Sequence, residues 1–114
     1  MNVRRETALW VAQRATAVVL AFCVLVHLVT IVYAVRGGLS AAEILERTRG
    51  SLGWGLFYGV FVIAAAVHGA IGLRAVAAEW LGFRGDAAEV VMTAIGVVLT
   101  IMGLRGVIAV VGTA

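Results

Sequence analysis

Apolar residues in this sequence gather in three long runs that are separated by short polar segments. The second run, from Leu52 to Leu73, holds 22 residues without a fixed charge. As a helix it would be about 33 Å long, at roughly 1.5 Å per residue, which is enough to cross a hydrocarbon core of about 30 Å. Comparable runs precede and follow it. The pattern therefore predicts three membrane-spanning helices.

Polar and glycine residues between the runs predict the boundaries of the elements. A short polar tail is expected at residues 1–7, and membrane helices are expected at about residues 8–35, 51–80 and 89–111. The apolar part of the first helix is longer than the core of a cleaved signal peptide, so we expect it to remain in the protein. Because the connections are short, neighbouring helices are expected to run in opposite directions.

A capping box predicts a further, short helix in the first connection. Ser40 is followed three residues later by Glu43, at the start of a segment at about 40–49 that carries Ile44 and Leu45 as its apolar face. This segment is too short and too charged to span, so we expect it on the membrane surface. The expected fold is an all-α membrane protein, with residues 1–114 forming a single transmembrane domain: three transmembrane helices in an up-down-up bundle and one interfacial helix.

Composition agrees with a membrane domain and excludes other classes. Of the 114 residues, 63% are apolar and only 13% are charged, and the mean hydropathy is +1.09. All nine cations are Arg, and none lies in a segment with interleaved aromatic residues that could follow a phosphate backbone, which argues against nucleic-acid binding. Five of them lie on the N-terminal side of the predicted bundle and four on the other, which favours a cytoplasmic N-terminus.

Two histidines, His27 and His68, lie inside the predicted spans. A titratable group within a membrane is costly and by default indicates function, and neutral imidazole is a common ligand of metals and haem iron. His68 lies in a stripe of small residues, with Gly72 one turn away, where another helix or a flat ligand could come close. The alternative for either histidine is a structural hydrogen bond to a neighbouring helix.

The predicted depths of the two histidines argue against a shared metal. His27 lies eight residues before Val35, or about 12 Å from the side opposite the N-terminus, and His68 follows Leu52 by 16 residues, or about 24 Å from that side. Allowing for tilt, their levels differ by roughly 10 Å. Two ligands of one haem iron must come within about 4 Å of each other. If either histidine binds haem, the opposite ligand must therefore come from another chain.

Two arginines, Arg14 and Arg74, are expected at one membrane level, on the N-terminal side. One interpretation is that they reach lipid headgroups. The other is a cationic ledge beside a haem edge or a quinone headgroup, flanked by Trp10 and Trp80, because guanidinium groups bind carboxylates and donate to carbonyl oxygens. No Asp or Glu is expected deep in a span, which argues against a transporter that works through a membrane carboxylate.

Two short motifs resemble the cytochrome b membrane subunit of succinate dehydrogenase (succinate:quinone oxidoreductase) or fumarate reductase. They are Gln13-Arg14-Ala15-Thr16-Ala17 in the first helix and His68-x-x-x-Gly72-x-Arg74 in the second, with Glu79 five residues further on. The family's first motif usually reads Ser-x-x-His-Arg-x-Ser/Thr-Gly. Arg14 and Thr16 match it, whereas Trp10, Gln13 and Ala17 replace the Ser, His and Gly. The resemblance covers roughly residues 9–80.

The resemblance implies a haem b-binding, quinone-reactive subunit that passes electrons from an iron–sulfur partner to quinone. His68 would be the axial ligand of a haem iron, with Arg14 and Arg74 beside the cofactor. The quinone would be bound by Arg14, Trp10 and Thr16. His27, followed by Leu28, resembles the first-helix histidine of the two-haem branch, which serves a second haem far from the dehydrogenase.

The family also implies partners that this chain needs. They are a second membrane-anchor chain that shares one haem, or two, an iron–sulfur subunit, and a flavoprotein that carries out the dicarboxylate chemistry, all at a bacterial inner membrane. The single Cys23 cannot hold an iron–sulfur cluster, so this chain would contribute only to the quinone site of the enzyme. The competing functions are a haemless scaffold that anchors a soluble partner and a small oligomeric transporter.

Overall fold

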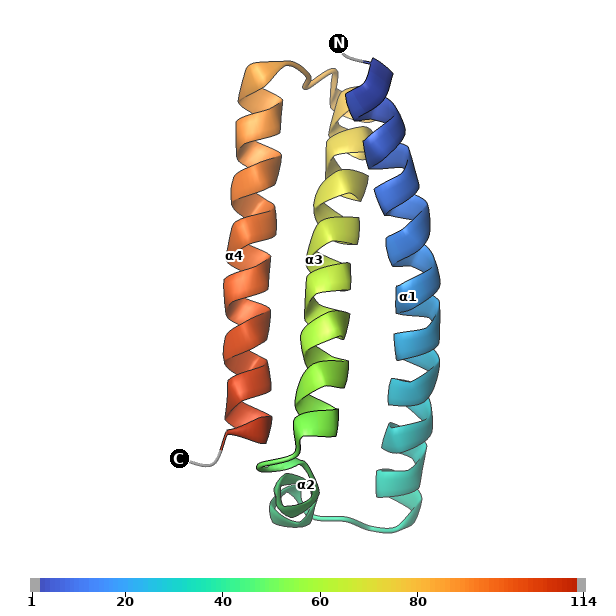
Figure 1. Ribbon diagram of the computed structural model, residues 1–114, viewed down its shortest axis with the longest axis vertical. Helices are drawn as coiled ribbons and strands as arrows, with labels where there is room; N and C mark the ends of the chain where they lie inside the picture. Colours follow the sequence, from blue (N-terminus) through green and yellow to red (C-terminus); the bar gives the residue numbers. More distant parts are fainter. Residues whose placement is uncertain (1–2, 113–114) are drawn as a thin grey trace.

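The structure of the protein, a computed structural model, describes residues 3–112. Within them the chain forms helices α1 (Val3–Arg36), α2 (Ala41–Thr48), α3 (Leu52–Leu81) and α4 (Asp86–Val111). The three long helices are each long and apolar enough to cross a membrane. They alternate in direction, and α2 lies across the end of the bundle away from the N-terminus (Figure 1). The expected all-α fold with three long apolar helices and a short fourth one is confirmed.

Two helices begin earlier than the sequence pattern predicted. Helix α1 begins at Val3 instead of about residue 8, so the described part of the expected polar tail is helical, and Met1 and Asn2 lie outside the described residues. Helix α4 begins at Asp86 instead of about residue 89. In each case an acidic residue, Glu6 or Asp86, lies in the first turn, where it interacts favourably with the positive end of the helix dipole.

The predicted capping box at the start of α2 is present. The hydroxyl of Ser40 accepts a hydrogen bond from the Glu43 main-chain N–H (3.2 Å), and the Glu43 carboxylate accepts one from the Ser40 N–H (3.1 Å). This bond from the Ser40 main chain, together with the Ser40 hydroxyl, holds the pKa of Glu43 below its ordinary value. These two reciprocal hydrogen bonds at the N-terminus of α2 explain why so short a helix forms at all.

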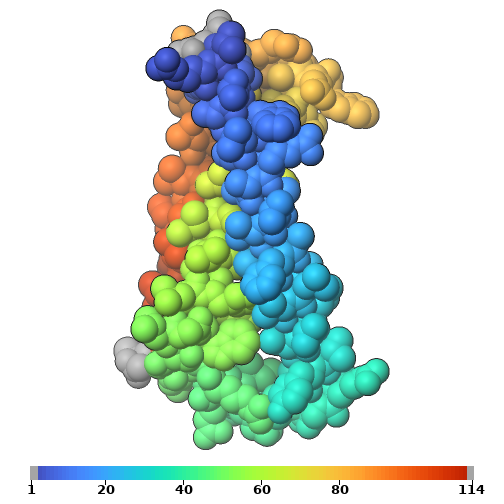
Figure 2. Space-filling view, turned by 45° about the vertical axis from the view of Figure 1, so that its right-hand side comes forward, coloured from blue at the N-terminus to red at the C-terminus, as the bar shows by residue number. Residues whose placement is uncertain are grey.

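The other end of α2 is tied to the last turn of α4. The Thr48 hydroxyl donates to the Val110 carbonyl oxygen (2.6 Å), and the Gly50 N–H donates to the Val111 carbonyl oxygen (2.7 Å). These are two of the carbonyls that a helix leaves without partners at its C-terminus. Figure 2 shows α2 and the start of α3 closing this end of the molecule beside α1.

Helix α3 is the middle helix of the bundle, and it packs against both α1 and α4, which contact each other little. The buried residues among those described are all small: Cys23, Ala64, Ala66, Ala77 and Ala88. Glycines allow the closest approaches. A methyl group on Gly96 would lie 3.2 Å from the Ala70 side chain, and one on Gly103 would collide with Val62. Large apolar side chains point outward along all three long helices, toward lipid or partner chains.

This packing predicts that Gly103→Ala loosens the contact between α3 and α4. Alanine gains about 1 kcal/mol over glycine in helix propensity, but overpacking against the β-branched Val62 costs about 1–3 kcal/mol. Gly106 is a matched control on the same helix, because nothing lies within 4 Å of a methyl group placed there. Thermal unfolding of the purified protein in detergent should show a lower midpoint for Gly103→Ala and an unchanged or higher one for Gly106→Ala. Equal midpoints would contradict this account of the packing.

Candidate functional site

His68 faces α1, where a hydroxyl group meets its ring. The Thr16 Oγ1 lies 3.2 Å from His68 Nδ1. The same hydroxyl is 2.8 Å from the Ala12 carbonyl oxygen and 3.1 Å from that of Gln13, so both are acceptors for its hydrogen. When that hydrogen goes to the main chain, the Thr16 oxygen can accept a hydrogen bond from Nδ1 of the imidazole, and Nε2 then keeps its lone pair. The His68 Nε2 has no hydrogen-bond partner among residues 3–112.

The stripe of small residues beside His68 has two different environments. Gly69 has open space around it, whereas a methyl group on Gly72 would lie 3.5 Å from the Gln13 side-chain nitrogen. The Gln13 side chain therefore occupies the space that Gly72 leaves between α1 and α3. Its carbonyl oxygen is buried and has no partner within the described part of the chain. The open space in this stripe is thus at Gly69, whereas Gly72 is covered by Gln13.

His27 is held by the facing helix in a similar way. Its Nδ1 lies 3.3 Å from the Tyr58 hydroxyl on α3, and its ring packs edge-on against Tyr58 and Phe61, with ring centroids 5.7 Å away in each case. The Nε2 of His27 has no hydrogen-bond partner in the described residues. Tyr58 was not predicted as a partner of His27. Its position in the sequence is nevertheless informative, because it lies six residues beyond Leu52, near the membrane level expected for His27.

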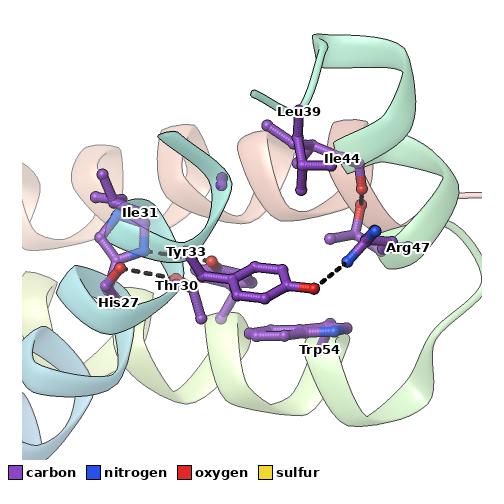
Figure 3. A pocket seen from close by; sticks show the side chains of 11 residues that line it. His27, Thr30, Ile31, Tyr33, Leu39, Ile44, Arg47 and Trp54 are labelled. Carbon is purple, nitrogen blue, oxygen red and sulfur yellow. Dashed lines mark hydrogen bonds between the residues drawn. The ribbon is translucent and has the colours of Figure 1, made fainter. Parts of the chain in front are cut away.

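A cavity of about 350 Å³ opens beside His27, between α1, α2 and α3. The residues that line it are His27, Thr30, Ile31, Tyr33, Ala34, Leu39, Ile44, Arg47, Thr48, Trp54 and Tyr58. Figure 3 shows Arg47 and Tyr33 joined at the end of the cavity away from His27. The Arg47 guanidinium donates to the Tyr33 hydroxyl (3.2 Å) and lies 5.6 Å from the centre of its ring. That hydrogen bond raises the pKa of Arg47 above its ordinary value, so the mouth of the cavity carries a fixed positive charge.

The two histidines lie at clearly different levels of the bundle. On α1, the partner of His68 is Thr16, 11 residues before His27, and on α3 the partner of His27 is Tyr58, ten residues before His68. At about 1.5 Å per residue, both helices give a separation of about 15 Å along the bundle. Residues 3–112 contain no group of three or more His, Cys, Asp or Glu side chains that could hold a metal ion. Within the described residues, the two histidines therefore lie too far apart along the bundle to bind one metal ion together.

Arg14 and Arg74 have different surroundings, although both were expected on one cationic ledge. Arg14 is exposed on α1, and its guanidinium carbon lies 5.1 Å from the centre of the Trp10 ring, which is itself 59% exposed. Arg74 turns inward, and only 18% of its side chain is exposed. Trp10 and Arg14 thus form an outward-facing aromatic and cationic pair, whereas Arg74 belongs to the bundle itself.

Arg74 is the centre of an ion-pair network that joins all three long helices. Its Nη2 lies 2.8 Å from a carboxylate oxygen of Glu6 on α1, and its Nε lies 2.6 Å from one of Glu89 on α4. The other oxygen of Glu89 lies 2.7 Å from Arg5 Nη2. This network was not predicted from the sequence, because it depends on which ends of the helices meet. We name these four residues, Arg5, Glu6, Arg74 and Glu89, the ion-pair clamp.

Comparison with known proteins identifies a family for most of the chain. Residues 1–109 match the model of a family described as succinate dehydrogenase/fumarate reductase transmembrane subunit. No curated protein and no solved structure matches the chain significantly.

The ion-pair clamp predicts that Arg74→Leu destabilises the protein much more than Arg5→Leu. Removing Arg74 leaves two carboxylates without their shared cation at a part-buried site, so the cost should lie between the about 0–1 kcal/mol of an exposed pair and the about 3–5 kcal/mol of a fully buried one. Arg5 is 53% exposed and contacts one carboxylate, so its loss should cost about 0–1 kcal/mol. Thermal unfolding of both variants in detergent measures the difference. Similar midpoints would show that the clamp contributes little to helix association.

Proposed function

Because the chain belongs to the family of succinate dehydrogenase/fumarate reductase transmembrane subunits, we propose that it is a haem b-binding, quinone-reactive anchor subunit. In this role it passes electrons from an iron–sulfur partner to quinone within the membrane. One observation carries the proposal: His68 lies in an apolar span, its Nδ1 lies 3.2 Å from the Thr16 hydroxyl, and its Nε2 has no partner in residues 3–112. A neutral imidazole in that state is a ready axial ligand.

The residues around His68 fit a b-type haem. Gly69 leaves open space on the same helix, so a flat group could approach the α3 backbone there. The two histidines are about 15 Å apart along the bundle and cannot share one iron, so the second ligand of each haem comes from the second membrane-anchor chain. When bound, the haem supplies a one-electron redox centre. The chain itself supplies the ligand, fixes the orientation of the imidazole and keeps the surroundings apolar.

His27 and its cavity are the proposed site of a second haem. The cavity presents one imidazole with a free Nε2, apolar and aromatic walls, and the Arg47 cation at its mouth. Arg47 has no carboxylate within 4 Å among the described residues, so its remaining N–H groups are open to an anionic group such as a haem propionate. The cavity is not large, which agrees with a cofactor shared with a partner chain.

The proposed quinone site lies on the outward face of α1, at Arg14 and Trp10. The Arg14 guanidinium can donate to a quinone carbonyl oxygen, and this hydrogen bond strengthens as negative charge develops there during reduction. Thr16 was expected to contact the quinone as well. It lies two residues from Arg14 on the same helix, and a quinone carbonyl would compete with the Ala12 and Gln13 carbonyl oxygens for its hydroxyl hydrogen. Arg74 lies nearby on α3, but its guanidinium is engaged by Glu6 and Glu89.

Two observations support the proposed partners: the chain has a single cysteine, and its family consists of transmembrane subunits of succinate dehydrogenase/fumarate reductase. Cys23 is buried in the bundle and is the only cysteine, so this chain cannot hold an iron–sulfur cluster by itself. In the proposed complex, electrons arrive through an iron–sulfur subunit and dicarboxylate chemistry takes place on a flavoprotein. The N-terminal side would face them in the cytoplasm of a bacterium. A haemless scaffold is the competing function, and an optical spectrum of the purified complex separates the two.

The haem assignment predicts that His68→Ala abolishes one b-type signal. The complex should still assemble in the membrane, because His68 makes one hydrogen bond and lies in no ion pair. The reduced-minus-oxidised absorbance and the pyridine haemochrome content per complex measure the loss. Full retention of all haem in an assembled His68→Ala complex would contradict ligation by this residue.

His27→Leu, measured in the same way, decides the number of haems. With two haems, each variant should lose about half of the wild-type haemochrome content. A single haem that is lost in His68→Ala and kept in His27→Leu would assign His27 a structural hydrogen bond to Tyr58.

The quinone assignment predicts that Arg14→Leu lowers succinate–quinone reductase activity at least tenfold, which corresponds to about 1.4 kcal/mol of lost transition-state stabilisation. Reduction of an artificial dye directly at the dehydrogenase should be unaffected. Arg49→Leu is the matched control, because it removes an exposed arginine at the opposite end of the bundle. Equal loss of both activities would indicate defective assembly, and unchanged quinone reduction would place the site elsewhere.

A further inference from the structure

The hydroxyl of Thr16 has two main-chain acceptors beside it in addition to the His68 ring. A hydroxyl has one hydrogen to donate, and the carbonyl oxygens of Ala12 and Gln13, at 2.8 and 3.1 Å, are both closer to the Thr16 oxygen than the imidazole is. With the hydrogen on the main chain, the third contact, 3.2 Å to His68 Nδ1, is one in which the imidazole donates. If Nδ1 carried no hydrogen, two lone pairs would face each other across this contact. The arrangement selects the tautomer in which Nε2 is the free ligand atom.

We propose that Thr16 is a positioning residue that fixes the tautomer and the orientation of His68 and thereby lowers the midpoint potential of its haem. This inference rests on the proposed function. A hydrogen bond to the outer N–H of a ligating imidazole makes the ring a stronger electron donor, which favours the oxidised iron. Thr16 acts on the iron only through His68, and it belongs to a different helix from the ligand.

The residue type suits this role. Threonine is β-branched, so few side-chain rotamers are available to it in a helix, and the bond to the preceding turn holds the hydroxyl in one of them. A flexible donor or acceptor would lose more entropy in making the same contact. Thr16 and His68 are both half-buried at the α1–α3 contact, where water does not replace a lost hydrogen bond as it would at an exposed site.

The second histidine, His27, also contacts a hydroxyl group, but this hydroxyl is free to donate or to accept. His27 Nδ1 meets the Tyr58 hydroxyl at 3.3 Å, but this phenol makes no hydrogen bond to the main chain in the described residues. It can donate or accept, so it does not select a tautomer. The constraint is therefore specific to the pair of Thr16 and His68.

The test compares the assembled complexes of Thr16→Val and Thr16→Ser by redox titration of the haem that His68→Ala abolishes. Valine keeps the shape of threonine without the acceptor, and serine keeps the acceptor. We expect a higher midpoint potential and a changed low-spin electron paramagnetic resonance signal in Thr16→Val, and values near those of the wild type in Thr16→Ser. Thr100→Val is the matched control, because Thr100 also donates to a carbonyl of its own helix, that of Gly96, at 2.8 Å, and forms no hydrogen bond with a histidine in the described residues.

Each result has a distinct consequence. An unchanged potential and spectrum in haem-loaded Thr16→Val would overturn the inference while leaving ligation by His68 intact. A raised KM for quinone at unchanged potential would also overturn it and would return Thr16 to the quinone site. A wild-type complex without haem, or one that keeps all haem in His68→Ala, would refute the proposed function itself and the inference with it.

A measurement on the wild-type complex covers the case in which Thr16→Val does not assemble. Redox-difference infrared spectra with ¹⁵N-labelled histidine distinguish an imidazole that is protonated at Nδ1 and hydrogen-bonded from one that is protonated at Nε2. The first is expected for the haem-linked histidine. The absence of a hydrogen-bonded Nδ1–H would overturn the assignment without any substitution.

Discussion

Close approach of α3 to its two neighbours is the constraint on which the rest of this structure depends. Lipid tails are as apolar as leucine, so helices in a membrane gain little by hiding large apolar side chains from the solvent, and association relies on van der Waals contact between backbones. Here the buried positions are Ala and Cys, and Gly96 and Gly103 let α4 come against Ala70 and Val62. The same close approach of α1 brings short side chains such as Thr16 within reach of the α3 histidine.

Polar contacts then decide how the closely packed helices are aligned. The ion-pair clamp fixes the N-terminal-side end, where Arg74 binds carboxylates from both α1 and α4, which otherwise contact each other little. At the other end, Thr48 and Gly50 bind the last carbonyls of α4. With both ends held, a helix cannot slide along its neighbour by one turn without breaking strong hydrogen bonds. This alignment sets the level at which each histidine meets its hydroxyl partner.

Two arginines on the N-terminal side of the bundle have different surroundings that a sequence pattern cannot separate. Arg14 and Arg74 have the same residue type and the same predicted depth, yet one is exposed beside Trp10 and the other is engaged by Glu6 and Glu89. Their difference comes from the direction in which each side chain leaves its helix relative to the neighbours. Of the two, Arg14 makes no ion pair within the described residues, and Arg74 contributes to holding the helices together.

The sequence alone determined the number of long helices, the short capped helix and the level of each histidine, because these follow from run length, local capping and a fixed rise per residue. It also predicted the family, since the motifs around Arg14 and His68 are local. It did not determine that α1 begins at Val3, that Gln13 fills the space above Gly72, or that Thr16 binds His68. Those features depend on the rotation of each helix about its axis. Here apolar residues surround every long helix, so no amphipathic face reveals that rotation, and only the contacts between helices set it.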